Sequence, residues 1–481
     1  MKNEVIKLKK LLSLVFAALI IFTCCGISTI AANAGGTAYY IDSVKGSDKN
    51  SGKSAAKAWK TLAKASKIRY KKGDKILIKR GTKISGKFVG AGYGTKSLPI
   101  TISAYGKGKN PVLTQKKDDY ILYFNDIKYW TIKNLSFRDS LRAIKIDAEN
   151  DVDVTGVKIT ACDFSNISNT DSKELDGAPC IFADNGSSKA LIKDMVISNI
   201  KITDSGRGIE IKGKNRERDD GAFVSEKVSY SKNILIENVN CFNLQYDAII
   251  LGSMRDSRVR NCRLINTCTK NDFATAPVWM HHCDNVTVEY CEISGANGQL
   301  DGMAIDFDGW TINSTYQYIF SHDNKRFMRN CLFDRETRNR NNTVRYCLSV
   351  NDNEGVFDYP SFVIPNETSN FITSMEGFNF YNNTIINGNP YLWINIKSAN
   401  VKNNIFASDS TLRSAGKALM NGLSFGVTKS GNVNTTVKNA GFVGGDPYNI
   451  KSYMLTPDSK NIGKGCFTDT SCANMLKIPV K

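Results

Sequence analysis

The 481-residue sequence predicts an all-β protein, a single-stranded right-handed parallel β-helix (solenoid) with an N-terminal cap. Three observations predict this fold. Short segments rich in Asn and β-branched residues recur from about residue 120 onward, and a second set of short strands alternates with them. No long segment has the apolar spacing of a helix. Short alternating strands cannot bury a face singly, but stacked coils enclose a continuous core.

The two kinds of segment differ in composition, and the repeat length varies between about 20 and 40 residues. The first kind includes "YWTIKNLSF", "NILIENVNCFN" and "NVTVEYCEIS", and the second includes "AIKID", "GIEIKG" and "AIDFDG". Asn tolerates the left-handed backbone of tight bends and can hydrogen-bond to an Asn stacked on it. We therefore expect the Asn residues at the corners of the coils.

The first 34 residues resemble a secretion signal. A basic stretch precedes an apolar run that starts at Leu11, and Ala32-Asn33-Ala34 is a small-x-small cleavage site. An uncleaved membrane anchor is the alternative, because the run is long enough to span a bilayer. We expect a secreted, extracellular protein, either free or associated with the cell wall, without stable membrane insertion after cleavage. The expected divisions are a signal peptide at 1–34, a basic cap with the first rungs at 35–120, the β-helix at 121–465 and a tail at 466–481.

The positive charge belongs to one region of the chain. The formal net charge is +18, and residues 35–120 hold 20 Lys and Arg against 5 Asp and Glu, whereas residues 121–481 hold 40 of each. A solvated basic face is the first interpretation, and attraction to an anionic cell-wall polymer is the second. No nucleic-acid-binding motif is present, so nucleic acid is not an expected partner. We expect a monomer.

Eleven of the 13 Cys follow residue 34. Several occur in similar frames, "VRNCRL", "VEYCEI", "MRNCLF" and "VRYCLS", which indicates buried thiols at equivalent positions instead of a disulfide framework. Cys466 and Cys472 are the pair that we most expect to be bridged. The "HHC" at 281–283 with Cys291 matches no standard zinc spacing, so no metal ligands are predicted there.

Several stretches resemble a known superfamily. "YYIDSVKGSDKNSGKSAAKAWKTLAKAS" and "KKGDKILIKRG" are similar to the N-terminal portion of secreted proteins of the pectate-lyase-like β-helix superfamily. "DGMAIDFDGW" followed by "YIFSHDN" resembles a rung of bacterial right-handed β-helix repeat proteins. The resemblance implies a carbohydrate-directed protein with a polysaccharide or oligosaccharide partner. It does not select a reaction, because the superfamily contains lyases, glycoside hydrolases, epimerases and non-enzymes.

Asp306 and Asp308 are the central candidates for catalysis. Their spacing puts both carboxylates on one face of a strand while Ile305 and Phe307 face the other way. Aligning the second kind of segment with Ile305 as an inward residue predicts which side chains share that outward face. One row should contain Glu210, Ile250, Trp279, Asp306 and Arg329, and the next row Lys212, Gly252, His281, Asp308 and Cys331.

This predicted face has the groups that carbohydrate chemistry needs. Trp279 could stack on a sugar ring, and His281 and Arg329 could stabilise carboxylates or a charged substrate group. Positions i and i+2 of a strand lie about 6.6 Å apart, between the separations of retaining and inverting glycosidases. We expect the two carboxyl pKa values to split, so that one acts as acid and the other activates water.

Two loops after this rung are predicted to reach over the same face. "SHDN" contributes Asp323 as a third catalytic candidate and His322 as a substrate-binding residue, and "NDNE" contributes Glu354. Glu210 and Lys212 complete the predicted substrate-binding residues.

Three functions remain open at this point. The first is a glycoside hydrolase that uses Asp306 and Asp308 and needs no cofactor. The second is a polysaccharide lyase with Lys212, Arg207 or Arg255 as base and Ca²⁺ beside the substrate carboxylate. The third is a non-catalytic cell-wall binding protein. An Asp-x-Asp pair is also compatible with a calcium site or with a solvated face. Only elimination creates an absorbing double bond, so the products separate hydrolase from lyase.

Overall fold

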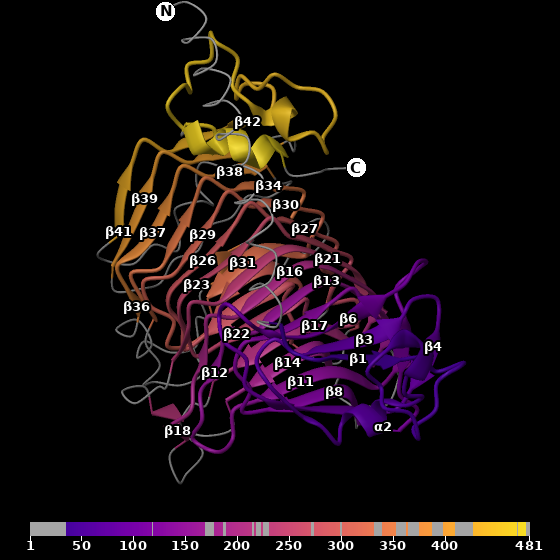
Figure 1. Ribbon diagram of the computed structural model, residues 1–481. Helices are drawn as coiled ribbons and strands as arrows, with labels where there is room; N and C mark the ends of the chain where they lie inside the picture. Colours follow the sequence, from indigo (N-terminus) through magenta and orange to yellow (C-terminus); the bar gives the residue numbers. More distant parts are fainter. Residues whose placement is uncertain are drawn as a thin grey trace, which may run out of the picture.

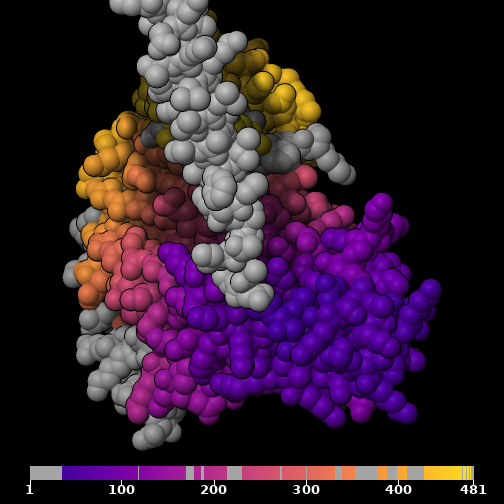
Figure 2. Space-filling view, viewed as in Figure 1, coloured from indigo at the N-terminus to yellow at the C-terminus, as the bar shows by residue number. Residues whose placement is uncertain are grey.

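The computed structural model has the predicted all-β solenoid fold, in which parallel strands stack from the indigo N-terminal end to the yellow C-terminal end (Figure 1). The space-filling view shows the same order of colours along the surface (Figure 2). The structure describes residues 35–117, 119–168, 178–185, 189–213, 216–217, 223–224, 230–270, 274–298, 301–330, 339–352, 362–363, 375–386, 398–408, 427–468 and 470–477. The predicted signal peptide and Glu354 lie outside the described residues.

Each coil contributes strands to two parallel sheets, one of 27 and one of 11 strands. In one complete coil, β25 (Val278–His281) belongs to the 11-stranded sheet. The chain then forms β26 (Asp284–Glu289) and β27 (Glu292–Ser294), which we call the first and second arms of the 27-stranded sheet. It returns to the 11-stranded sheet at β28 (Met303–Phe307), which pairs in parallel with β25. The fold is therefore a three-faced coil.

The remaining elements follow this scheme. The 11-stranded sheet also contains β2 (Arg69–Tyr70), β5 (Phe88–Gly92), β8 (Tyr120–Asn125), β11 (Arg142–Asp147), β14 (Pro179–Asp184), β17 (Arg207–Lys212), β22 (Ile249–Gly252), β31 (Arg326–Asn330) and β35 (Phe362–Val363). The 27-stranded sheet also contains β1 (Ala38–Ile41), β3 (Lys75–Lys79), β4 (Lys83–Ser85), β6 (Ile100–Tyr105), β7 (Val112–Thr114), β9 (Trp130–Lys133), β10 (Ser136–Ser140), β12 (Val154–Thr155), β13 (Lys158–Ile167), β15 (Ile192–Lys193), β16 (Val196–Ser205), β20 (Ser231–Lys232), β21 (Leu235–Leu244), β23 (Met254–Arg260), β24 (Arg263–Ile265), β29 (Thr315–Gln317), β30 (Phe320–His322), β33 (Thr343–Arg345), β34 (Leu348–Val350), β37 (Phe378–Tyr381), β38 (Thr384–Ile386), β39 (Ala399–Lys402), β40 (Ile405–Ser408), β41 (Val427–Ser430) and β42 (Val433–Thr436). Two-stranded pairings join β18 (Arg216–Glu217) to β19 (Phe223–Val224) and β32 (Asn339–Arg340) to β36 (Met375–Glu376), and the helical elements are η1 (Ala55–Lys57), α2 (Leu62–Ala65), η5 (Ile450–Tyr453) and η6 (Thr470–Lys477).

The core is a set of inward columns of aliphatic side chains. On the first arm, strand pairing stacks Ile102, Ile132, Ile159, Ile197 and Ile236 in successive coils, all fully buried. β-Branched side chains pack well on such a pleated surface, and full burial of each one contributes about 1.5–3 kcal/mol relative to exposure. The repeat in the sequence is therefore the repeat of this column.

The prediction of Asn at the corners is confirmed. Asn199, Asn238 and Asn261 occupy equivalent corner positions with φ near +55°, where Asn is well tolerated. The Asn238 amide donates to Asn199 Oδ1 at 3.4 Å. Inside the last coils a second ladder includes the fully buried Asn383 and Asn404, and there the Asn404 amide donates to Oδ1 of the half-buried Asn432 at 2.9 Å. These ladders satisfy polar groups from coil to coil.

The buried thiols are confirmed, but the expected disulfide is wrong. Ten cysteines of the described residues are free and buried, and Cys331 lies outside those residues. The Cys472 thiol donates to the Cys466 carbonyl oxygen at 2.6 Å instead of joining the Cys466 sulfur. Burial raises the pKa of the Cys466 thiol, so it behaves as a small apolar group.

The ends of the coil are covered differently. At the N-terminal end β1 already pairs with β3, and Trp59 and Leu62 join the main core. At the other end the described rung strands finish with β42, and the chain then packs on the outside of the second arm, where Phe320 and Leu348 form a second apolar cluster with Tyr453 and Met475. In the part of the chain that the structure describes, no helix is both long and apolar enough to cross a membrane.

Candidate functional site

The register that the sequence predicts for the outward face is confirmed. Strand pairing aligns Glu210 with Ile250, Ile250 with Trp279, Trp279 with Asp306, and Asp306 with Arg329. His281 lies beside Gly252 in the neighbouring row, and Asp308 follows β28, its amide donating to the Met280 carbonyl oxygen at 2.9 Å. Because adjacent coils are about 4.8 Å apart, Trp279, Asp306 and Arg329 are direct neighbours on one face.

The Trp279 ring is fixed by a residue that the sequence reasoning missed. Its indole N–H donates to Asp247 Oδ1 at 2.8 Å, and Arg207 Nε donates to Asp247 Oδ2 at 3.0 Å. The Ala276 amide also donates to Asp247. Burial raises the Asp247 pKa, while Arg207 and the indole lower it. Asp247 has no sequence signal of its own, because it lies in the corner before β22.

His281 is present on the face, but it cannot supply a positive charge. Its Nδ1 lies 3.1 Å from Nδ1 of His282, and its ring lies against Trp279 with centroids 5.4 Å apart. Burial lowers the pKa of His281 to about 3, with His282 and Lys212 contributing, and burial lowers that of His282 to about 4. Both imidazoles are neutral near pH 7. The expected electrostatic support of the carboxylates by His281 is therefore wrong.

Gly252 makes room for the His281 ring. A Cβ at position 252 would lie 2.5 Å from His281 Nε2, well inside van der Waals contact. The His281 ring can therefore occupy this space because residue 252, one coil earlier, has no side chain.

Three carboxyl groups meet beyond Trp279. Asp306 is 4 % exposed, Asp308 9 % and Asp301 8 %. Burial raises the Asp306 pKa well above its ordinary value, and the charges of Asp308 and Asp301 raise it further, whereas Arg329 lowers it. Like charges in a poorly solvated site cannot all ionise. The raised pKa of Asp306 therefore favours its protonated form more than that of an ordinary aspartate.

Asp301 is the second residue that the sequence reasoning missed. Arg329 Nη1 lies 2.5 Å from Asp301 Oδ1, so the two form an ion pair across neighbouring coils. Asp301 comes from the corner immediately before β28, in "LDGMAIDFDG". The sequence does contain a signal for Asp301, because a residue in the corner before a strand lies beside the first outward side chains of that strand. Alternation within the strand does not extend to this corner residue, so alternation alone did not include Asp301.

The carboxyl groups of Asp306 and Asp308 interact, because Asp308 is among the groups that raise the Asp306 pKa. Their backbone positions are about 6.6 Å apart by strand geometry, between the carboxyl separations of retaining and inverting glycosidases. The prediction that this pair acts on a glycosidic bond stays a prediction, and Asp301 adds a third carboxyl group that influences Asp306.

Glu210 and Lys212 lie on the same sheet, three pairings from Asp306 and Asp308. Burial raises the Glu210 pKa, while Arg207 and Lys212 lower it and Asp247 raises it further. Lys212 lies beside Asp184 in the adjacent coil. These two residues extend the polar face towards the N-terminus but do not join the set of carboxyl groups formed by Asp301, Asp306 and Asp308.

His322 and Asp323 belong to a different face. His322 ends β30 on the second arm, where its Nδ1 lies 2.8 Å from Asp323 Oδ2 and its Nε2 lies 3.4 Å from Glu292 Oε1. Its ring contacts Tyr448 from the C-terminal segment. The expectation that this loop reaches over the Asp306 face is not met. Arg255, a base candidate of the lyase hypothesis, pairs with Asp284 at 2.8 Å on the 27-stranded sheet.

Within the described ranges, no group of three or more His, Cys, Asp or Glu side chains is arranged to hold a metal ion.

The chain was compared with known proteins. No family model matches it. A lacto-N-biosidase from Bifidobacterium longum subsp. longum is 23% identical over 476 residues, which cover 75% of this chain but only 28% of that protein. The chain therefore spans little more than a quarter of this relative.

Two solved structures are similar to this chain. Pectate lyase Pel9A matches 90% of this chain and 92% of its own, at 14% identity with a TM-score of 0.43. The GH136 lacto-N-biosidase of Eubacterium ramulus matches 83% of this chain and 68% of its own, with 16% sequence identity and a TM-score of 0.58. The likeness to this second structure supports the right-handed β-helix fold.

Proposed function

We propose that the protein is a glycoside hydrolase whose reaction takes place at Asp301, Asp306 and Asp308. The observation that carries the proposal is the buried Asp306, whose pKa is raised well above its ordinary value by burial and by the charges of two other carboxyl groups, Asp308 and Asp301, the latter paired with Arg329. A glycosidase needs a carboxylic acid that donates a proton to the leaving oxygen and a carboxylate that attacks or activates water. The likeness to two lacto-N-biosidases supports a carbohydrate-active enzyme of this class.

The three carboxyl groups are suited to different tasks. Asp306 is the least exposed of the three, and Asp308 raises its pKa. We therefore assign Asp306 as the group that shares a proton with Asp308, and Asp308 as the acid that donates this proton to the glycosidic oxygen. Asp308 and Asp301 are more accessible and come from the two ends of β28. We assign them as the two working carboxyl groups, with Arg329 fixing Asp301.

Trp279 and the neutral His281 form the sugar platform beside this group. An indole face held at a fixed angle by Asp247 suits stacking on the apolar face of a sugar ring. A neutral imidazole can donate or accept a hydrogen bond from a hydroxyl group. Because both relatives are lacto-N-biosidases, lacto-N-biosides are the first substrates to examine.

The test is a product assay on a chromogenic lacto-N-bioside and on pectic, hemicellulosic and uronate polysaccharides. Reducing ends and ultraviolet absorbance are followed together for the wild type and for Asp301→Asn, Asp306→Asn and Asp308→Asn. The proposal expects reducing ends without absorbance, and losses of about 10²–10⁴-fold in the Asp301 and Asp308 variants. Absorbance that persists in those variants would reject it in favour of elimination. Absence of any product would favour the binding-protein hypothesis.

A further inference from the structure

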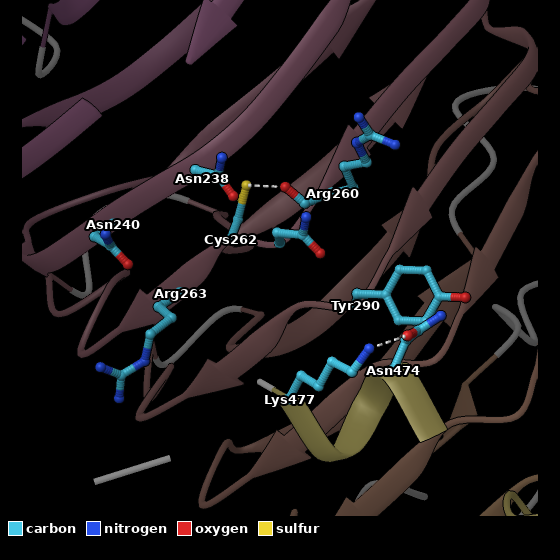
Figure 3. A pocket seen from close by; sticks show the side chains of 9 residues that line it. Asn238, Asn240, Arg260, Cys262, Arg263, Tyr290, Asn474 and Lys477 are labelled. Carbon is cyan, nitrogen blue, oxygen red and sulfur yellow. Dashed lines mark hydrogen bonds between the residues drawn. The ribbon is translucent and has the colours of Figure 1, made fainter. Parts of the chain in front are cut away.

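A groove follows the corner between the two arms of the 27-stranded sheet. It has a volume of about 530 Å³ and is lined by Asn238, Asn240, Arg260, Asn261, Cys262, Arg263, Tyr290, Asn474 and Lys477. Strands of the coil form its floor, and η6 of the C-terminal segment forms one wall, with Asn474 and Lys477 near Tyr290 (Figure 3). A second hollow of about 350 Å³ shares Asn238 and Asn240 and continues to Ala161. The two hollows thus adjoin at Asn238 and Asn240, and we call them together the corner groove.

The corner groove offers the same kind of group at successive coils. Strand pairing places Asn199, Asn238, Asn261 and Tyr290 at equivalent corner positions, with φ between 54° and 55°. Coils repeat about every 4.8 Å, so side-chain amides recur at that interval along the groove. Within the described corner, each amide that bonds to its neighbour still has further donor and acceptor capacity for a ligand. A ligand made of repeated polar units fits such a surface.

An aromatic surface closes the C-terminal end of the corner groove. The Tyr290 ring stacks on Tyr318 with centroids 4.8 Å apart and an angle of 2°, and Tyr318 stacks on Tyr346 at 5.2 Å. This stack holds the Tyr290 ring in one orientation beside the amide row. Flat amides next to a fixed aromatic ring are a combination that binds sugars, through hydroxyl hydrogen bonds and stacking.

Two of the four cations that line the corner groove, Arg260 and Arg263, are paired with acidic neighbours, whereas Lys477 donates to the neutral Asn474 Oδ1 at 3.0 Å. Arg260 Nη2 donates to Glu237 Oε2 at 2.8 Å, and Arg263 Nε donates to Glu292 Oε2 at 2.5 Å. Each guanidinium has five N–H groups, so these bonds neutralise its charge without using all its donors. An acidic ligand would have to displace these pairs, whereas a neutral ligand need not.

We propose that the corner groove is a second carbohydrate-binding site, which holds a neutral glycan chain across several coils. It lies on the 27-stranded sheet, whereas Asp306 lies on the 11-stranded sheet. The proposal does not depend on the reaction assigned to the carboxyl groups, because binding here requires no turnover. Such a site would keep the protein on a polymer while the other face acts.

The test measures binding of six-unit neutral xylo- and galacto-oligosaccharides, with hexagalacturonate as the acidic comparison, by titration calorimetry on the full chain carrying Asp308→Asn. Tyr290→Asn removes the aromatic ring and replaces it with Asn, the residue found at the equivalent corners. Asn238→Gly removes a side-chain amide, and Gly tolerates the left-handed backbone at this position. Asn233→Gly is the matched control, because Asn233 has φ 55° and an exposed ladder bond to Asp194 but lies at another corner.

We expect the protein to bind a neutral oligosaccharide with an affinity that salt leaves unchanged. This affinity should fall at least about tenfold in Tyr290→Asn and in Asn238→Gly, but not in Asn233→Gly. Binding that is unaltered in both groove variants would overturn the proposal. So would binding of hexagalacturonate alone that disappears at high salt, or no binding at all. In otherwise wild-type protein, the groove variants should turn over a small chromogenic glycoside normally, which separates this proposal from the proposed hydrolase.

Discussion

At the scale of single residues, alternation along β28 was enough to place Asp306 on an outward face beside Trp279 and Arg329. The pairing of β25, β28 and β31 follows that alignment residue for residue. Asp247 and Asp301 could not be found in the same way, because corners have no period of two. The charge state of His281 was also out of reach, since it depends on burial beneath neighbouring groups and not on the residue type.

Asp306→Asn should make stability less sensitive to pH. The folded protein keeps the Asp306 proton at pH values where the unfolded chain has lost it. Between these two pKa values the free energy of unfolding of the wild type therefore falls by about 1.4 kcal/mol per pH unit. Asn resembles the protonated acid and does not titrate. The denaturant midpoint should fall less between pH 4 and pH 7 in the variant than in the wild type. An equal fall in both proteins would contradict a raised Asp306 pKa.

Gly252→Ala should destabilise the protein by about 1–3 kcal/mol, because the new methyl group enters the space of the His281 ring. His281→Ala in the same chain should recover most of the loss, since it removes the clashing ring. Thermal unfolding of both single variants and the double variant tests this coupling. Additive losses would show that the glycine is required for another reason.

At the scale of elements, the Asn-rich segments were recognisable as corners and the β-branched segments as strands, because both properties are local. The contact between η6 and the outside of the second arm was not predictable, since it joins segments far apart in sequence, such as those of Phe320 and Met475. His322 is the clearest case. Its sequence neighbours suggested a loop above the Asp306 face, yet Glu292 and Tyr448 surround it instead.

His322 should stabilise the packing of the C-terminal segment in a pH-dependent way. Burial lowers its pKa, but bonds to Asp323 and Glu292 outweigh this and raise it to about 9. Protonated His322 therefore contributes stability fully below about pH 6.5, the ordinary value, and the contribution is lost as pH rises through about 9. The thermal midpoint of His322→Gln should change less between pH 6 and 9 than that of the wild type. The same change in both proteins would exclude the ion pairs as its cause.

Asn404→Ala should lower stability by about 2–4 kcal/mol. The Asn404 amide donates to Phe380 O and Asn432 Oδ1, and its oxygen accepts from the Asn383 backbone and side chain. Its removal takes a hydrogen bond from Phe380 O and from the buried Asn383 backbone N–H, and each lost partner costs about 1–3 kcal/mol before relaxation. Asn403→Gly on the neighbouring half-buried corner, where φ is 53°, is the matched control and should be nearly neutral. Thermal unfolding compares the two variants.

At the scale of the whole molecule, repetition predicted the solenoid and its continuous core. The reaction was not predictable at this scale, because the same coil supports different chemistries through a few outward side chains. The basic region at 35–120 shows what composition can and cannot predict. Its excess of Lys and Arg predicts a positively charged surface, but it does not indicate which face carries the catalytic residues.

The most direct test of the hydrolase assignment is the mass of the products released from a defined oligosaccharide. Hydrolysis predicts products whose masses sum to the substrate plus one water, with formation abolished or strongly reduced in Asp301→Asn and in Asp308→Asn. Products that sum to the mass of the intact substrate, one of them unsaturated, would contradict the account and identify elimination.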